Sequence, residues 1–216
     1  MKRVAWFLLV AAAVMALALP TAAQTPNLAT VAARVSEAPV IDGVLDDAAW
    51  LTASQMGAKL VSDQDNSGSF ISAYPRVAYL AYDDNNLYVG IKIFTADASA
   101  LVTEAASYWN TDEVEVFLEC PDTMMYYKIT VTAAGDCYEA SGIGLSTAAV
   151  SKGDTYWVVE AVMPFATLGK TPKAGDVWGI NVVGHQVADG DMWICWNPTY
   201  GGFNNPSRFG SLTFLD

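Results

Sequence analysis

Residues 109–119, WNTDEVEVFLE, show the most regular alternation of apolar and polar positions in the chain. Successive side chains of a β-strand point to opposite faces, so this segment is predicted to be a strand with two unlike faces. One face carries Val114, Val116 and Leu118. The other carries Glu113, Glu115, Phe117 and Glu119. We therefore expect the first face to lie in a core and the second to meet something polar.

The next segment, residues 126–132, also alternates, and it places Tyr126, Lys128 and Thr130 on one face. A hairpin through residues 120–124 would set Lys128 opposite or diagonal to Phe117 and close to Glu115. An aromatic ring can pack on the apolar face of a pyranose while charged groups hydrogen-bond its hydroxyls, so the surface suits a sugar. It equally fits an exposed sheet face with a cross-strand ion pair, and these two strands alone favour that interpretation.

The rest of the chain reads as short strands separated by turns. Strands are predicted at residues 75–82, 87–94, 155–163, 178–187, 192–196 and 211–215. The turn sequences DDNN at 83–86 and ADGD at 188–191 separate two of the strand pairs, residues 63–69 are predicted to be a loop, and a brief helix is expected around Trp50. With almost no helical periodicity, the pattern predicts an all-β protein, an antiparallel β-sandwich in a single domain.

The first 23 residues have the features of a secretory signal peptide. Lys2 and Arg3 precede an apolar stretch at residues 6–19, and Thr21 and Ala23 suit the small-residue positions of a cleavage site. We expect cleavage after Ala23, which leaves residues 24–216 as the folded domain. No later segment is apolar enough to span a bilayer. The product is therefore predicted to be secreted or periplasmic, without insertion into a membrane.

The composition limits the kinds of partner and chemistry. A net charge of −12 repels phosphate, so nucleic acid and anionic membranes are not expected partners. The three cysteines, Cys120, Cys137 and Cys195, allow at most one disulfide and do not have the spacing of a zinc site.

Catalysis is not indicated by the residue pattern. The carboxylates of Asp112, Glu115, Glu119 and Glu160 are the candidates for a glycosidase pair, but nothing indicates a deep cleft around them. His185 is the sole histidine, and no nucleophile elbow is present. We expect a protein that is not an enzyme.

Several motifs together resemble family 9 carbohydrate-binding modules. They are IDGVLD at 41–46 with Trp50, AYDDNNLY at 81–88, Trp109 with Asp112 and Glu115, Trp157 with Glu160 and Pro164, and PSRFG at 206–210. Their order is that of the family, and they cover nearly all of residues 24–216. The resemblance implies an immunoglobulin-like sandwich that binds carbohydrate without catalysis, and such modules usually accompany a glycoside hydrolase.

The resemblance also implies a site. Trp109 would be one ring of an aromatic clamp around a sugar, usually at the end of a polysaccharide chain, and Phe203 would be the other. Glu115 matches the family's acid, and Lys128 stands where well-understood members have arginine. Tyr126, on the face that carries Lys128, completes the predicted ligand-binding residues. Because Gly184 and His185 stand where many members carry an arginine after the Gly-x-Asn motif, the particular sugar stays open.

The remaining questions concern ions and rival functions. Family members often hold structural calcium, so calcium is a candidate ion here, but no metal ligand is assigned. Relatives of the sandwich bind haem b through axial methionine and histidine or lysine, which makes His185 the candidate ligand of an electron-transfer domain. A sugar-independent surface interaction domain would have the same composition. Of the tryptophans, Trp50, Trp157 and Trp178 are predicted in the core, and Trp193 and Trp196 on opposite faces of one strand.

Overall fold

The computed structural model describes residues 27–123, 125–139 and 146–216, so the predicted signal peptide at residues 1–23 lies outside it. The strands are β1 Ala29–Arg34, β2 Lys59–Asp65, β3 Ile71–Tyr82, β4 Asn86–Phe94, β5 Glu113–Cys120, β6 Met125–Thr132, β7 Cys137–Glu139, β8 Thr147–Lys152, β9 Tyr156–Pro164, β10 Val177–Gln186, β11 Met192–Cys195 and β12 Gly210–Phe214. The helices are α1 Ala48–Gln55 and the 3₁₀ turns η1 Ala98–Ala100, η2 Tyr108–Asn110, η3 Phe165–Leu168 and η4 Pro206–Arg208. None of these helices is long and apolar enough to cross a bilayer.

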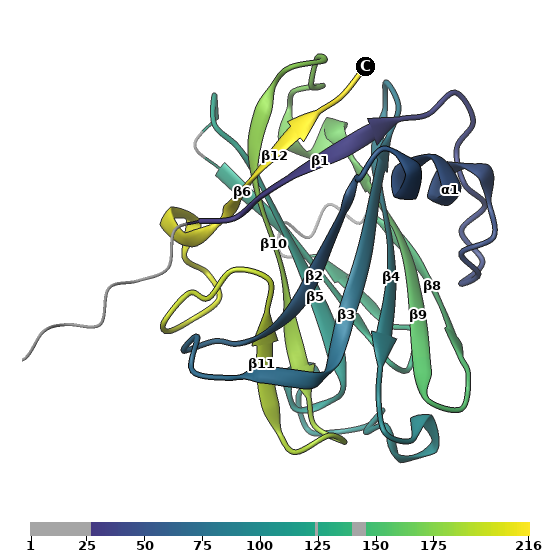
Figure 1. The fold of residues 1–216 in the computed structure, drawn as a ribbon, viewed down its shortest axis with the longest axis vertical. Helices are drawn as coiled ribbons and strands as arrows, with labels where there is room; N and C mark the ends of the chain where they lie inside the picture. Colours follow the sequence, from purple (N-terminus) through teal and green to yellow (C-terminus); the bar gives the residue numbers. More distant parts are fainter. Residues whose placement is uncertain (1–26, 124, 140–145) are drawn as a thin grey trace, which may run out of the picture.

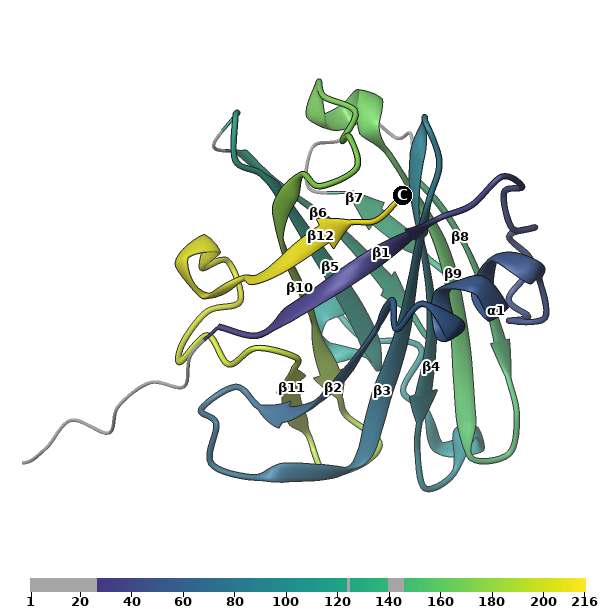
Figure 2. The same cartoon turned by 45° about the horizontal axis from the view of Figure 1, so that its top comes forward.

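The strands form two layers that face each other (Figure 1). One layer has the order β7-β6-β5-β10 and is called the β5 layer; the other has the order β3-β4-β9-β8 and is called the β4 layer. Along one side the layers are joined by the pairing of β11 with β2 and of β12 with β1 (Figure 2). Apart from β1, which runs parallel to β12 and β3, neighbouring strands are antiparallel. The predicted antiparallel β-sandwich is confirmed.

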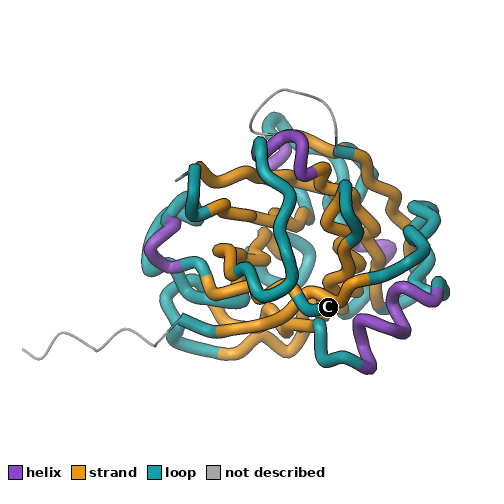
Figure 3. Tube along the Cα trace, turned by 90° about the horizontal axis from the view of Figure 1, so that it is seen from above, coloured by secondary structure: helices purple, strands orange, loops and turns teal. Residues whose placement is uncertain are grey.

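The main core fills the space between the two layers. The strand β4 contributes Leu87, Val89, Ile91 and Ile93, as its alternation predicted. The strand β5 contributes Val114, Val116 and Leu118 from the opposite layer. Trp157 and Trp178 are buried in the same core, and Trp50, a residue of α1, is buried against Ala81 and Tyr88, so all three predictions for these tryptophans are confirmed. Seen from above, the helical segments lie at the periphery of the strands (Figure 3).

The polar face of β5 differs from the expectation, because it is also buried. Glu113, Glu115 and Phe117 are all shielded from water. Phe117 packs in a second cluster with Val183, Cys195 and Phe209, on the outside of the β5 layer. The loops that precede β5 and β12 fold back over this outer face, which strand periodicity cannot reveal. The acidic row therefore lies in a covered site and not on an open surface.

Four strands were not predicted from the sequence, namely β1, β2, β7 and β8. The loop predicted at residues 63–69 is partly wrong, since β2 continues to Asp65. The sequence of β1, ATVAAR, has no strict alternation of apolar and polar residues, and its buried residues, Thr30, Ala32 and Ala33, come from both of its faces. The strand β8 pairs on one side only, with β9, and its middle residues are half-buried, so its two faces are alike. All three cysteines are free in the structure.

Glu160 of β9 fastens the segment before α1 to the sheet. Its Oε2 atom accepts the N–H groups of Asp42 and Gly43 at 2.9 and 2.7 Å, and its Oε1 atom accepts the indole N–H of Trp50 at 2.6 Å. A carboxylate satisfied by this many donors is structural, as expected for this residue.

Candidate functional site

An ion pair occupies the covered face of β5 and β6. The strand register sets Lys128 opposite Phe117, and the Lys128 Nζ atom lies 2.7 Å from Glu115 Oε1. The two side chains are only 15% and 8% exposed. Burial is the largest single influence and lowers the pKa of Lys128, but the hydrogen bond and the charge of Glu115, with smaller contributions from Tyr108 and Glu113, together raise it above its ordinary value. The pair predicted from the alternation is therefore present, charged and mostly removed from water.

Aromatic rings border this pair on the side of the turn η2. Trp109 is 50% exposed and meets Tyr108 edge to face, with ring centroids 5.1 Å apart. Tyr108 stacks on Tyr138 at 4.7 Å, and its ring centroid lies 5.9 Å from Lys128 Nζ. The turn thus carries a solvent-accessible indole next to a buried charge pair, a combination that suits recognition of a polar molecule with an apolar face.

A second pair of rings lies on the side of β11. Trp193 is 41% exposed and faces the ring of Phe203 edge on, with centroids 5.6 Å apart. Together with Asn66, Gly201 and Gly202 they line a cavity of about 340 Å³. Trp196 is buried in the core, so the prediction that the two tryptophans of this strand face opposite ways is confirmed. The alternation of residues 192–196 predicts that one of the two indoles points outward, but it does not predict whether this is Trp193 or Trp196.

The loop that carries Phe203 is tied to the β2–β3 connection. Asn66 Oδ1 accepts the backbone N–H and the hydroxyl of Thr199 at 3.0 and 2.6 Å, and Asn66 Nδ2 donates to the carbonyl of Gly201. Phe203 itself is half-buried against the cluster around Phe117. The loop is therefore held in place although it contains two adjacent glycines.

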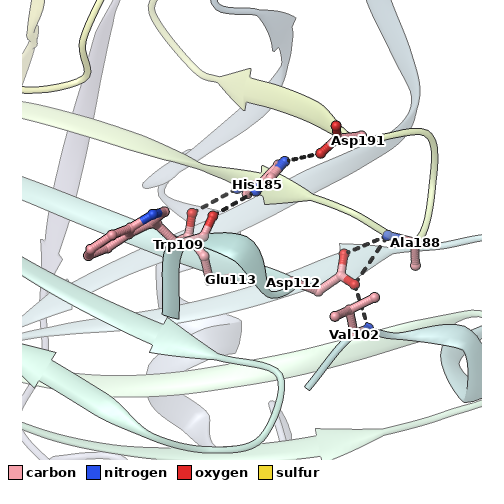
Figure 4. A network of polar contacts seen from close by, with 7 residues as sticks. All are labelled: Val102, Trp109, Asp112, Glu113, His185, Ala188 and Asp191. Carbon is pink, nitrogen blue, oxygen red and sulfur yellow. Dashed lines mark hydrogen bonds and ion pairs between the residues drawn. The ribbon is translucent and has the colours of Figure 1, made fainter. Parts of the chain in front are cut away.

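His185 of β10 links the turn that carries Trp109 to Trp193, and Figure 4 shows its contacts with Trp109, Glu113 and Asp191. Its Nδ1 atom is 2.8 Å from the Trp109 carbonyl oxygen, and its Nε2 atom is 2.7 Å from Asp191 Oδ1. Its backbone N–H donates to Glu113 Oε1 at 2.8 Å. The imidazole stacks on Trp193, with centroids 3.9 Å apart and planes 11° apart. The prediction from sequence did not include His185 or Trp193 among the sugar-binding residues.

The five predicted ligand-binding residues lie on the outer face of the β5 layer in two groups. Trp109, Glu115 and Lys128 form one group beside η2. Tyr126 and Phe203 form the other, against Phe117. Glu115 and Lys128 are in direct contact. Tyr126 packs against Phe117 at 5.9 Å. Within the described residues, no ring contact joins Trp109 to Phe203. The connection between these two rings runs through His185 and Trp193.

Beneath this face lies a buried acid with a buried base behind it. Burial, and then the charge of Glu115, raise the pKa of Glu113 well above its ordinary value. Glu113 Oε2 has no hydrogen-bond partner within the described part of the chain. Burial lowers the pKa of Arg76 to about 10, although nearby carboxylates, Glu113 first, oppose this. The acid and the base thus both lie below the surface, out of reach of a large ligand.

Two ions were considered from the sequence, calcium and the iron of haem. In the described ranges, no group of three or more His, Cys, Asp or Glu side chains is arranged to hold a metal ion. The oxygen-rich turn at Asp65 uses its carboxylate on the N–H groups of Ser69 and Phe70. Both ring nitrogens of His185 have partners, and Trp193 stacks on the ring, so it offers no free nitrogen to a haem iron.

Comparisons with known proteins give one family and one fold. The profile of the family described as carbohydrate family 9 binding domain-like matches residues 41–216. Two solved structures of a family 9 carbohydrate-binding module from Caldicellulosiruptor kristjanssonii are similar, both 21% identical in sequence. For the complex with cellotriose the TM-score is 0.70, and the match covers 87% of this chain and 93% of the module. For the complex with glucose the TM-score is 0.67, and the match covers 86% of this chain and 95% of the module. A comparison with curated proteins finds no match.

Proposed function

Because the chain belongs to the carbohydrate family 9 binding domain-like family, we propose that it is a non-catalytic module that holds a sugar on the outer face of the β5 layer. The observation that carries this proposal is the Glu115–Lys128 pair, which is mostly removed from water yet bordered by accessible rings. Desolvating an ion pair is costly, so its retention here favours a role in recognition. The pair supplies an acceptor and a donor for hydroxyl groups.

The rings provide the apolar part of the site. Trp109 packs on one face of the sugar, and Phe203, supported by the edge contact with Trp193, packs on the other. Tyr126 extends the same face beyond Phe117. Aromatic rings contribute buried area at a small cost in side-chain entropy, whereas the charged pair sets the orientation of the sugar. Phenylalanine has less stacking area than tryptophan, and lysine lacks the bidentate geometry of arginine, so we expect modest affinity.

The ligand class follows from the relatives. The C. kristjanssonii module was solved with glucose and with cellotriose, so gluco-oligosaccharides are the first ligands to test here. A clamp of two rings suits the end of a polysaccharide chain. We expect the module to act alongside a separately encoded glycoside hydrolase.

Export is the second part of the proposal. Cleavage after Ala23 would release residues 24–216 to the periplasm or the medium, where polysaccharide is found. Expression in a secreting host followed by N-terminal sequencing checks this, with Gln24 as the expected first residue. A product that stays in the cell with Met1 intact would contradict it.

Calorimetric titration of residues 24–216 with glucose, cellotriose and xylo-oligosaccharides tests the site. Trp109→Ala and Phe203→Ala should each weaken binding by about fivefold to thirtyfold, because an aromatic anchor contributes on the order of 1–2 kcal/mol. Glu115→Gln should also weaken it. The control is Leu51→Ala, an exposed residue on α1 at the other layer, which should bind as the wild type does.

Unchanged binding in folded Trp109→Ala and Glu115→Gln variants would refute the site. A folded wild type that binds no glycan would instead favour the alternative of a sugar-independent interaction domain. A red product with a Soret band would revive the haem alternative.

A further inference from the structure

The two ring nitrogens of His185 both face hydrogen-bond acceptors. The Trp109 carbonyl oxygen, 2.8 Å from Nδ1, has no proton to give, so Nδ1 must carry one. Asp191 Oδ1, 2.7 Å from Nε2, belongs to an exposed carboxylate, which accepts as well. A neutral imidazole has one N–H and can satisfy only one of these contacts. The arrangement is therefore complete only with the doubly protonated ring.

Asp191 in the β10–β11 turn is the charged group in contact with the ring, and Glu113 of β5 accepts the backbone N–H of His185. The other charged groups on the neighbouring elements are Glu115 of β5, Asp112 before β5, Asp189 after β10, Arg76 of β3 and Lys128 of β6. Of the two cations, Lys128 is paired with Glu115, and Arg76 donates to the backbone carbonyl of Glu113 at 3.5 Å.

The ring face adds a further contact for the cation. The imidazole lies 3.9 Å from the indole of Trp193 and nearly parallel to it. A cation over an indole face is attracted by the ring's electrons, and the attraction is lost when the proton leaves. Protonation thus strengthens the contact with Trp193 and lets the ring donate to the Trp109 carbonyl and to Asp191 at the same time.

We propose that His185 is a positioning residue of the sugar site, which in its protonated form fastens the turn of Trp109 to Trp193 and thereby makes sugar binding weaken as the pH rises. This rests on the proposed function, because Trp109 and the rings beside Phe203 are the walls of that site. Histidine side chains in general change charge between about pH 5 and 8, so this is the range to test. The neutral ring has one N–H group, so it loses its hydrogen bond either to the Trp109 carbonyl oxygen or to Asp191.

The first experiment does not depend on sugar. As the sole histidine, His185 can be followed by ¹⁵N NMR of its ring in tag-free residues 24–216 from pH 5 to 8. We expect two protonated ring nitrogens at the acid end, and a shift of the Trp193 indole resonance when the proton is lost. A single neutral tautomer at pH 5.5, or a Trp193 resonance that does not respond, would overturn the proposal.

The second experiment measures the affinity for cellotriose over the same range. The wild type should bind roughly tenfold to a hundredfold more weakly at pH 8 than at pH 5.5, as expected for the loss of one hydrogen bond to a charged group. Asp191→Asn should flatten this profile while binding is retained, since an amide can donate to a neutral Nε2 or accept from a protonated one. His185→Gln should flatten it as well.

The matched control is Asp84→Asn, an equally exposed carboxylate paired with Arg34 at the β3–β4 turn, which should keep the wild-type profile. A pH dependence that persists in both His185→Gln and Asp191→Asn would contradict the proposal. If no sugar binds at any pH, the proposed function fails. The ¹⁵N spectra of the His185 ring and the Trp193 indole resonance still decide whether His185 connects the turn of Trp109 to Trp193.

Discussion

At the scale of single residues, buried carboxyl groups determine much of the local structure. Glu160 holds the segment before α1 through backbone and indole N–H groups, whereas Glu113 is buried with one oxygen unpartnered. The two residues come from similar alternating strands. Their different roles follow from what the fold places beside each of them, and each role gives a prediction.

Replacing Glu160 by glutamine tests its structural role. The amide nitrogen of glutamine is a donor and would face either the backbone N–H groups of Asp42 and Gly43 or the indole N–H of Trp50, which would then lack an acceptor. We expect Glu160→Gln to lower the free energy of unfolding by about 2 kcal/mol. Urea denaturation measures this, with the exposed residue change Glu104→Gln as control. Equal stability of the two variants would show that the contacts to Asp42 and Trp50 contribute little.

The buried carboxyl of Glu113 predicts a pH dependence. Its pKa is raised in the folded protein, so the folded state binds the proton more tightly than the unfolded chain does. Its contribution to the free energy of unfolding is therefore present below the ordinary value of 4.5 and is lost as the pH rises through the raised one. Glu113→Gln stays neutral, so its stability relative to wild type should increase from pH 5 to 8. Parallel curves in urea denaturation would contradict this.

Alternation and register allowed part of the site to be predicted. They placed Lys128 opposite Phe117 and beside Glu115, and the structure has this arrangement. The contact of His185 with Trp109 could not be predicted in this way, because the two residues are 76 positions apart in the sequence, whereas the stacking of His185 on Trp193 follows the register of β10 and β11. Periodicity assigns a side chain to a face, but it does not identify the loop that covers that face.

At the scale of elements, the close approach of β10 to β5 depends on Gly184. A Cβ atom there would collide with the carbonyl oxygen of Glu113 and come within 2.9 Å of the Val114 Cα atom. Backbone atoms of a central strand cannot move away easily. The pairing that carries His185 and Glu115 on one surface thus requires glycine at this position.

We therefore expect Gly184→Ala to destabilise the domain by about 2–3 kcal/mol, because the added methyl group forces the two strands apart. The control is Gly202→Ala, where an added Cβ meets no atom within 4 Å. Thermal unfolding of both variants measures the difference. Equal midpoints would mean that the sheet accommodates the methyl group.

The element scale also explains which strands could be predicted. The hairpin of β3 and β4 alternates strongly and is joined by an Asp/Asn turn, so it was found. The strands β1 and β8 have faces of similar burial, so no period of two appears in their sequences. Strands without unlike faces are recognised only once their partners are known.

At the scale of the whole molecule, one core lies between the two layers and includes residues from both. A shared core implies cooperative unfolding, so residues 24–216 should unfold in a single transition by both tryptophan fluorescence and circular dichroism. The three cysteines are free, so a reductant should not move the midpoint. Separate transitions for the two probes, or a lower midpoint with dithiothreitol, would contradict this description.

The most direct test of the sugar site is to follow the indole N–H resonances of residues 24–216 during titration with cellotriose. Trp109 and Trp193 border the proposed site, whereas Trp50, Trp157, Trp178 and Trp196 are buried elsewhere. We predict that the first two resonances shift with saturation and that the other four stay in place. Shifts confined to the buried tryptophans, or no shift at saturating sugar, would contradict the proposed site.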